Sequence, residues 1–200
     1  MASLIYIHGF LSSPQSFKAQ QVKTWLASHR PDIQYHCPFL PPYPAEAQKI
    51  LEHWVESLPR PIYLMGSSLG GYWCSWLVEK YDLRAVLINP AVQPSMLIPE
   101  FIGAELKNYH TEDTYTLTAA HVDQIKAVDT EEIRRTDHYW VLLQTEDETL
   151  DYRLAAAKYK ECRLLIEEGG DHGFQGFERH IPASIAFLEQ GADTEEPSIR

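Results

Sequence analysis

The sequence contains no apolar run long enough to cross a membrane. Its longest apolar stretches, such as Leu4–Ile7, Ile62–Met65 and Ala85–Ile88, fall far short of the roughly 18 residues that a span requires. The N-terminus MASLIYIHGF lacks a basic region and does not resemble a signal peptide. We therefore expect a cytoplasmic protein that has no membrane partner.

Positive charge and cysteine are both scarce. Lys and Arg number 17 against 28 Asp and Glu, which gives a formal net charge of −11. Most of such a surface repels phosphates, so the composition argues against nucleic acid as a partner. Cys37, Cys74 and Cys162 are odd in number and lack C-x-x-C spacing. That pattern favours reduced thiols over a disulfide framework or a zinc site, and we expect neither a metal nor another cofactor.

The chain has enough apolar material for one folded domain. It has 200 residues, 44 % of them hydrophobic and 12 % aromatic, and single domains commonly have this length. The last ten residues, GADTEEPSIR, contain little that could be buried. We expect a single domain over residues 1–190 and a flexible tail over residues 191–200. The composition does not fix whether the protein is a monomer or a small homo-oligomer.

Short runs of β-forming residues alternate with segments of helical periodicity. The predicted strands are Leu4–Ile7, Ile33–Cys37, Ile62–Met65, Ala85–Asn89, Tyr139–Gln144 and Arg163–Glu167. The predicted helices are Gln15–His29, Ala45–Leu58, Leu69–Tyr81, Tyr152–Tyr159 and Ile181–Glu189. This alternation predicts an α/β fold with a mostly parallel central sheet and helices on both faces.

Residues 91–138 interrupt the alternation with a weaker pattern. They are far longer than the 2–6 residues that usually connect elements of α/β units. We expect extra helices or a small cap-like insertion over the edge of the sheet.

The segment Gly66-Ser67-Ser68-Leu69-Gly70 has the pattern G-x-S-x-G and lies between a predicted strand and a predicted helix. In such a sharp turn the neighbouring backbones nearly touch, and glycine two residues before and after the serine relieves the clash. Ser68 is then a candidate nucleophile. The alternative is a Ser/Gly turn in which Ser67 or Ser68 only caps the helix.

Activation of a serine requires a histidine as the base, and the histidine requires a carboxylate partner. With a serine in a strand-to-helix turn of this kind, both residues are expected later in the chain, the carboxylate before the histidine. His172 lies in a glycine-flanked loop after a late strand. Four carboxylates, Glu146, Asp147, Glu148 and Asp151, follow the strand that ends at Gln144. Asp147 is the preferred acid because a short side chain just past the strand has few rotors to fix. Glu146 and Asp151 remain alternatives.

Loops at the ends of the strands should form the rest of the site. The backbone N–H groups of Phe10 and Leu69 are candidates for an oxyanion hole. Candidates for the walls of a substrate pocket are Phe10, Leu11, Tyr43, Tyr72, Trp73 and the apolar part of Met96–Ile102. Trp73 and Trp76 have helical spacing, however, which favours a place in the core.

Together these motifs resemble those of the small bacterial α/β-hydrolase esterases of the YqiA type. The segments that carry the resemblance are YIHGFLSSPQS near the start, Pro-Pro-Tyr-Pro at 41–44, GSSLGGY at 66–72, Asn89-Pro90-Ala91-Val92, Thr145-x-Asp147-Glu148 with Leu150-Asp151-Tyr152, and Glu168-Gly169-Gly170-Asp171-His172-Gly173-Phe174. The resemblance spans nearly the whole chain. Glu146 departs from it, because this family is expected to have glycine there.

The resemblance implies an α/β-hydrolase fold and a compact serine esterase for small acyl esters or acyl-CoA thioesters, with Ser68, Asp147 and His172 as its catalytic triad. We expect a carboxylesterase that acts through an acyl-enzyme and prefers short acyl chains, since the insertion offers little material for a long acyl tunnel. The alternatives are an acyl-CoA thioesterase or lactonase with the same triad, and a catalytically silent scaffold, which the fold alone never excludes.

Overall fold

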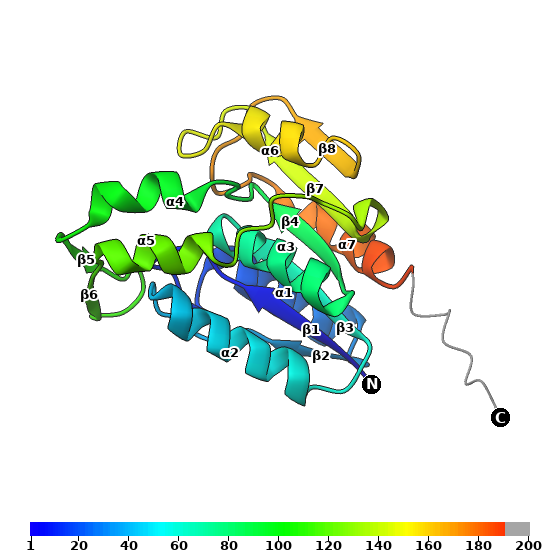
Figure 1. Cartoon of the computed structure of the whole chain (residues 1–200). Helices are drawn as coiled ribbons and strands as arrows, with labels where there is room; N and C mark the ends of the chain where they lie inside the picture. Colours follow the sequence, from blue (N-terminus) through cyan, green and yellow to red (C-terminus); the bar gives the residue numbers. More distant parts are fainter. Residues whose placement is uncertain (191–200) are drawn as a thin grey trace.

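A computed structural model describes residues 1–190, and its centre is a parallel β-sheet (Figure 1). Within these residues, six strands pair in the order β2-β1-β3-β4-β7-β8, each parallel to its neighbours. Their bounds are Ala2–Ile7 (β1), Ile33–His36 (β2), Ile62–Ser67 (β3), Arg84–Ile88 (β4), Tyr139–Gln144 (β7) and Arg163–Glu167 (β8). The predicted α/β fold is confirmed. The expected flexible tail, 191–200, lies outside the described residues.

The central strands are buried on both faces. Burial is nearly unbroken along β1, β3, β4 and β7, whereas the edge strand β8 is partly exposed. On β1, Ile5 and Ile7 pack into the core on one face, and Leu4 and Tyr6 pack into the core on the other. Successive side chains of a strand point to opposite faces, so such a sheet needs a helical layer on each side.

Helices supply both layers (Figure 1). Their bounds are Phe17–His29 (α1), Pro44–Ser57 (α2), Leu69–Tyr81 (α3), Tyr152–Lys158 (α6) and Ile181–Leu188 (α7), with the 3-10 turn η3 at Phe177–His180. α1 and α7 cover one face through residues such as Val22 and Ile185. α2, α3 and α6 cover the other through residues such as Leu51, Leu77 and Ala155.

Helix α1 starts two residues later than its periodicity indicated. Before it, the N–H of Gln15 donates to the hydroxyl of Ser13 (3.0 Å), and the N–H of Ser16 donates to the carbonyl of Ser13 (3.0 Å). These bonds form a local turn that competes with a helix. Ser16 therefore lies at the end of the loop, and α1 begins at Phe17.

The segment between β4 and β7 folds into short elements that pack onto the α2 and α3 side of the sheet. They are α4 (Pro94–Leu97), η1 (Ile98–Phe101), β5 (Glu105–Lys107), β6 (Thr114–Thr116), α5 (Ala119–Lys126) and η2 (Thr136–His138). The antiparallel pair β5 and β6 was not predicted. Leu106, Leu117, Ile125 and Val128 are buried in the same core as α2 and α3, which anchors the segment to the sheet.

The hairpin loop between β5 and β6 is attached to the loop that follows β1. Asn108 Nδ2 donates to the carbonyl of Ser12 (2.9 Å), and the N–H of Tyr109 donates to the carbonyl of Leu11 (2.8 Å). Asn108 Oδ1 also accepts two N–H groups of its own turn, and the residue is buried. These bonds join segments that lie about 100 positions apart in the sequence.

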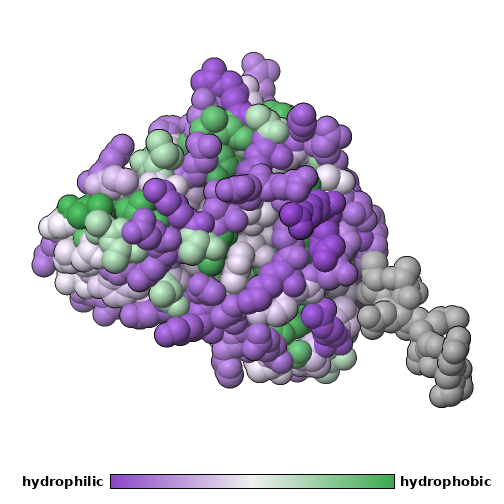
Figure 2. Space-filling model, viewed as in Figure 1, coloured by the Kyte–Doolittle hydropathy of each residue, from purple (hydrophilic) through white to green (hydrophobic). Residues whose placement is uncertain are grey.

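The surface is largely hydrophilic on the face shown in Figure 2, with scattered apolar patches, some of them on the left, where Figure 1 shows α4, β5 and β6. The exposed large hydrophobic residues of the segment between β4 and β7 are Met96, Leu97, Ile102 and Tyr109. Over residues 1–190, none of the helices combines the length and the hydrophobicity needed to cross a membrane.

Candidate active site

Ser68 lies at the sharp turn between β3 and α3. Its backbone has φ 53° and ψ −122°, a conformation that costs energy for a residue with a Cβ. Three backbone hydrogen bonds hold it: the N–H of Ser68 donates to Ile88, and the carbonyl of Ser68 accepts from Gly71 and Ala91, each at 3.0 Å. The turn is therefore fixed by β4 and by the segment after it.

The glycines of the G-x-S-x-G segment permit this turn. A Cβ on Gly66 would lie 2.4 Å from the carbonyl oxygen of Gly70, and a Cβ on Gly70 would lie 1.9 Å from the carbonyl oxygen of Ile7. Neither contact is possible, so α3 can approach β1 and β3 this closely only because both positions lack side chains.

His172 and Asp147 are brought together from two loops at the same edge of the sheet. Asp147 follows β7 and His172 follows β8. His172 Nδ1 lies 2.9 Å from Asp147 Oδ1 and 2.8 Å from Oδ2. The Asp147 side chain is only 2 % exposed, whereas that of His172 is 24 % exposed. The ring is thus held from its buried side and open on the other.

The Asp147 carboxylate is fixed by its own loop as well. Oδ1 accepts the N–H groups of Thr149 (2.9 Å) and Leu150 (2.8 Å). Burial raises the pKa of Asp147, but the hydrogen bonds from His172, Leu150 and Thr149 outweigh burial, and the net pKa is below its ordinary value. Asp147 is therefore a charged acceptor for the ring of His172.

The other three carboxylates of this loop have different positions. Glu148 Oε2 accepts the backbone N–H of His172 at 2.9 Å and so positions the main chain of the loop. Asp151 caps α6 and pairs with Arg153 (Oδ1–Nε 2.8 Å). Glu146 is exposed. Of the four, only Asp147 contacts the ring of His172 in the structure.

Asn89, at the end of β4, links this histidine loop to the sheet. Its Nδ2 donates to the carbonyls of Asp171 (3.0 Å) and His172 (3.2 Å), and its Oδ1 accepts the N–H of Gln144 (3.0 Å). The side chain is buried. Sequence reasoning did not assign it a role, although an asparagine directly after a buried strand was the available signal.

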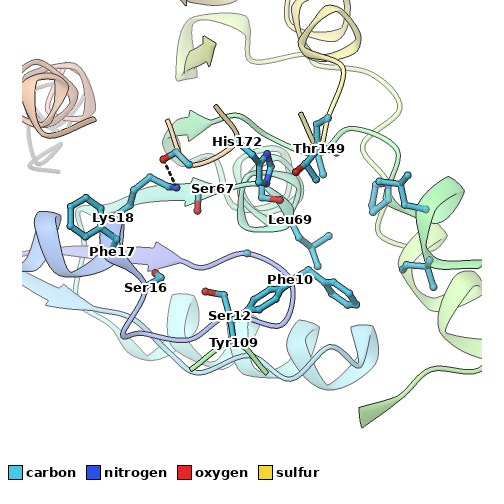
Figure 3. A pocket seen from close by; sticks show the side chains of 18 of the residues that line it. Phe10, Ser12, Ser16, Phe17, Lys18, Ser67, Leu69, Tyr109, Thr149 and His172 are labelled. Carbon is cyan, nitrogen blue, oxygen red and sulfur yellow. Dashed lines mark hydrogen bonds between the residues drawn. The ribbon is translucent and has the colours of Figure 1, made fainter. Parts of the chain in front are cut away.

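Ser68 and His172 line the same cavity, which has a volume of about 360 Å³ (Figure 3). Phe10 and Leu69, the candidates for an oxyanion hole, line it too. Leu69 is the first residue of α3, where a backbone N–H has no partner within the helix. The candidate nucleophile, histidine and oxyanion donors thus come together at one cavity.

His8 supports the loop that contains Phe10. Its Nε2 accepts the N–H of Leu40 (3.0 Å), so Nδ1 carries the proton and donates to the carbonyl of Gly9 (2.9 Å). The ring is 2 % exposed. Burial lowers the pKa of His8, against the opposing effect of the bond to Gly9. His8 is therefore a neutral structural support next to the cavity.

Both apolar and polar residues line the cavity. The apolar residues are Phe10, Phe17, Leu69, Ala91, Pro94, Leu97, Ile98, Phe101 and Leu150. Besides Ser68 and His172, the polar residues are Ser12, Ser16, Lys18, Ser67, Tyr109 and Thr149. From the predicted stretch Met96–Ile102, Leu97, Ile98 and Phe101 line the cavity, and the ring of Phe101 packs on that of Phe10 (centroids 5.6 Å apart).

Three residues that the sequence suggested for the pocket lie elsewhere. Leu11 is buried in the core beneath the loop. Tyr43 packs against Tyr115 and His121. The buried Tyr72 donates its hydroxyl to the carbonyl of Ile125 (2.7 Å). Tyr72 and Tyr43 thus fasten the segment between β4 and β7 to the fold and do not line the cavity.

The two tryptophans of α3 pack in the core. Trp73 is 2 % exposed, and Trp76 packs against it with ring centroids 5.8 Å apart. Trp73 therefore contributes to the core and not to the pocket. In the part of the chain that the structure describes, no three His, Cys, Asp or Glu side chains are grouped so that they could hold a metal ion.

Comparison with known proteins identifies a protein family and several solved structures that this chain resembles. The model of the family described as "Uncharacterised protein family (UPF0227)" matches residues 3–189. Among solved structures, Est1E from Butyrivibrio proteoclasticus is 18 % identical, with a TM-score of 0.67 over 94 % of this chain and 86 % of its own. Mouse alpha/beta hydrolase domain-containing protein 10 is 14 % identical, with a TM-score of 0.73 over 94 % and 90 %.

A structure reported for the metagenome-derived lipolytic enzymes LipS and LipT is 15 % identical, with a TM-score of 0.63 over 94 % of each chain. At these identities the likeness establishes the α/β-hydrolase fold.

We expect the substitution Gly70→Ala to destabilise the protein by more than about 3 kcal/mol. The added Cβ would meet the backbone oxygen of Ile7 at 1.9 Å, and neither backbone can move without disturbing the sheet. Gly9→Ala is the matched control, since its Cβ would lie 3.4 Å from Ser68 Cβ, and it should cost less than about 1 kcal/mol. Urea unfolding followed by tryptophan fluorescence measures both. Equal losses in the two variants would contradict this account of the turn.

We also expect His8 to make stability pH-dependent. The pKa of His8 is lower in the folded state than in the unfolded state. Below about pH 6.5, His8 is therefore protonated more readily in the unfolded chain than in the folded chain. Folding is therefore favoured above that pH, and this contribution is lost as the pH falls towards 5. The difference in unfolding free energy between wild type and His8→Gln should shrink between pH 7.5 and pH 5. A constant difference would mean that His8 is not buried as a neutral ring.

Proposed function

The chain belongs to the UPF0227 family, the family of the YqiA-type proteins whose motifs it shares, and we propose that it is a serine carboxylesterase with Ser68, His172 and Asp147 as its catalytic triad. The observation that carries the proposal is the bond between His172 Nδ1 and the buried Asp147. Because that bond occupies Nδ1, Nε2 is the nitrogen of His172 that can accept a proton. His172 and Ser68 both line the cavity.

The chemistry follows from this arrangement. His172 Nε2 takes the proton of Ser68 Oγ as the oxygen attacks the carbonyl carbon of an ester. The N–H groups of Phe10 and Leu69 donate to the oxyanion of the tetrahedral intermediate. The imidazolium, stabilised by Asp147, returns the proton to the leaving alcohol, and an acyl-enzyme remains. Water, deprotonated by His172, then releases the carboxylic acid and regenerates Ser68.

The substrate class proposed here is a short-chain acyl ester. A cavity of about 360 Å³ lies at the small end of the range for ligand pockets, and the apolar lining residues Phe10, Phe101 and Ile98 suit an acyl chain. A thioesterase or lactonase would use the same three residues, and a silent scaffold would use none of them. We further propose that the reaction takes place in the cytoplasm and requires no cofactor.

Ser68→Ala should abolish labelling by a fluorophosphonate probe and lower the turnover of a soluble ester by about 10⁴-fold or more. Ser68 is the serine at the centre of the G-x-S-x-G turn, where a nucleophile is presented to the histidine base. Ser67→Ala is the control, because Ser67 ends β3 and its hydroxyl accepts a bond from Tyr6 (3.2 Å), and most activity should remain. Labelling that survives in Ser68→Ala and is lost in Ser67→Ala would refute the assignment, and absence of labelling in wild type would indicate a silent scaffold.

Asp147→Asn should lower kcat on the order of 10³–10⁴-fold, because an amide favours the wrong tautomer of His172. Glu146→Gln and Asp151→Asn should change kcat by less than about threefold, because an exposed carboxylate is screened by water and salt. Steady-state kinetics of the three variants on one soluble ester decides among these carboxylates. A severe loss in Glu146→Gln with a mild one in Asp147→Asn would transfer the acid to Glu146.

Esters of short acids should be hydrolysed faster than esters of long acids. We expect kcat/KM to peak at two to six acyl carbons, roughly, and to fall by about tenfold at twelve, because the cavity is small. The measurement is a chain-length series of p-nitrophenyl esters below their critical micelle concentrations. Acetyl-thiocholine and a γ-lactone, tested alongside, separate ester from thioester and lactone preference. An optimum at long chains would point to a lipid or long-chain thioester substrate.

A further inference from the structure

The cavity at Ser68 contains one cationic side chain. Of its lining residues, all within residues 1–190, only Lys18 is a Lys, Arg, Asp or Glu. Lys18 is the second residue of α1, and in Figure 3 its side chain extends from that helix toward Ser67. A charged group is expensive to place in a largely apolar pocket unless it has a partner, so the position calls for an explanation.

Among residues 1–190, the ammonium of Lys18 has one hydrogen bond. Its Nζ donates to the carbonyl of Gly173 at 2.8 Å, next to His172 (Figure 3). Across the described residues, no ion pair within 4.0 Å includes Lys18. Since an ammonium has three N–H donors, Lys18 retains donors for a ligand in the cavity.

The two carboxylates that interact electrostatically with Lys18 form hydrogen bonds with other side chains. Burial lowers the pKa of Lys18, whereas Asp171 and Asp147 act in the opposite direction. Asp147 binds His172, and Asp171 Oδ2 accepts from Gln175 Nε2 at 3.0 Å. Neither carboxylate forms a direct pair with the ammonium.

Ser16 supplies a second unused polar group beside Lys18. Its Oγ is buried and has no hydrogen-bond partner among residues 1–190. Ser16 precedes the first residue of α1, but its hydroxyl does not cap the helix. It lines the same cavity. A buried hydroxyl without a partner loses free energy. Rotation of the Ser16 side chain toward the cavity that this residue lines would let a ligand oxygen supply the missing bond.

The charge of the rest of the molecule makes this lysine significant. The formal net charge is −11, and Asp147, Glu148 and Asp171 surround the histidine loop. This environment repels an anionic substrate. A single cation on the wall of the cavity that Ser68 also lines offers such a substrate a local attraction.

We propose that Lys18 and Ser16 bind a carboxylate carried by the ester substrate, so that the preferred substrate is a monoanionic ester. One ammonium and one hydroxyl match the two oxygens and single charge of a carboxylate better than the three oxygens and near-double charge of a phosphate. The proposal rests on the proposed esterase function. The carboxylate belongs to the acyl part or to the alcohol part of the substrate, and two pairs of esters distinguish these cases.

The first pair is phenyl hydrogen adipate and its neutral amide, phenyl adipamate, which place the charge on the acyl part. The second pair is 4-carboxyphenyl butyrate and 4-carbamoylphenyl butyrate, which place it on the alcohol. Within one pair, we expect wild-type kcat/KM to be at least about tenfold higher for the carboxylate than for the amide. Lys18→Met should reduce that ratio to about one, and Ser16→Ala should reduce it about threefold.

Lys23→Met is the matched control, since Lys23 is an exposed lysine of the same helix. It should leave the ratio unchanged, which separates a local contact from a general loss of positive charge. A preference in the first pair places the carboxylate on the acyl part, and a preference in the second pair places it on the alcohol.

The proposal is overturned if wild type shows no carboxylate preference in either pair, or if the preference survives in Lys18→Met. It is equally overturned if Lys18→Met lowers both members of each pair by the same factor, because Lys18 would then only tie α1 to the histidine loop.

A binding measurement separates this proposal from the esterase function. Calorimetry on Ser68→Ala, which does not cleave, should give a Kd at least about tenfold lower for the carboxylate of one pair than for its amide. The difference should vanish in Ser68→Ala/Lys18→Met. If wild type cleaves no ester and Ser68 resists the fluorophosphonate probe, the esterase function fails, while the calorimetry still decides whether Lys18 binds a carboxylate.

Discussion

The close approach of α3 to β1 and β3 is the constraint on which the candidate site depends. It requires glycine at positions 66 and 70, since a side chain at Gly70 would overlap the carbonyl oxygen of Ile7. It also holds Ser68 at φ 53° with support from Ile88, Gly71 and Ala91. Because α3 begins immediately after the serine, the same approach places Leu69, the first residue of this helix, in the lining of the cavity.

The remaining parts of the site are loops whose positions are fixed by buried polar side chains. His8 holds the loop after β1 against Leu40, and Asn108 ties the β5–β6 hairpin to the same loop. Asn89 joins the ends of β4 and β7 to the loop of His172. Each side chain is buried, so a lost bond leaves a polar group without water. Loops held in this way keep a fixed geometry although they lack regular structure.

Charge is distributed unevenly around the cavity. Asp147 and Glu148 approach His172 from one side, one at the ring and the other at the backbone. Lys18 extends from α1 and donates to the neighbouring carbonyl of Gly173. An imidazolium formed during the proposed reaction would be stabilised by the first group. The second group makes the cavity selective among substrates, according to our inference.

The sequence by itself determined the alternation of strands and helices, because burial on two faces and helical periodicity are local patterns. It also singled out Ser68 and His172, whose glycine-rich surroundings reflect local backbone geometry. It favoured Asp147 as the acid and kept Glu146 and Asp151 as alternatives. In the structure, Asp147 is the one that contacts the ring of His172.

Tertiary structure alone decided which side chains face the cavity. Three residues predicted for the pocket pack elsewhere, in the core or against α5 and the segment around it: Leu11, Tyr43 and Tyr72. Three residues without such a prediction line the cavity: Ser16, Lys18 and Tyr109. Loop side chains take their direction from contacts with distant segments, such as the bonds from Asn108 and Tyr109 to the loop after β1. Those contacts exist only when the sheet brings the ends of its strands to one edge, so no local pattern in the sequence encodes them.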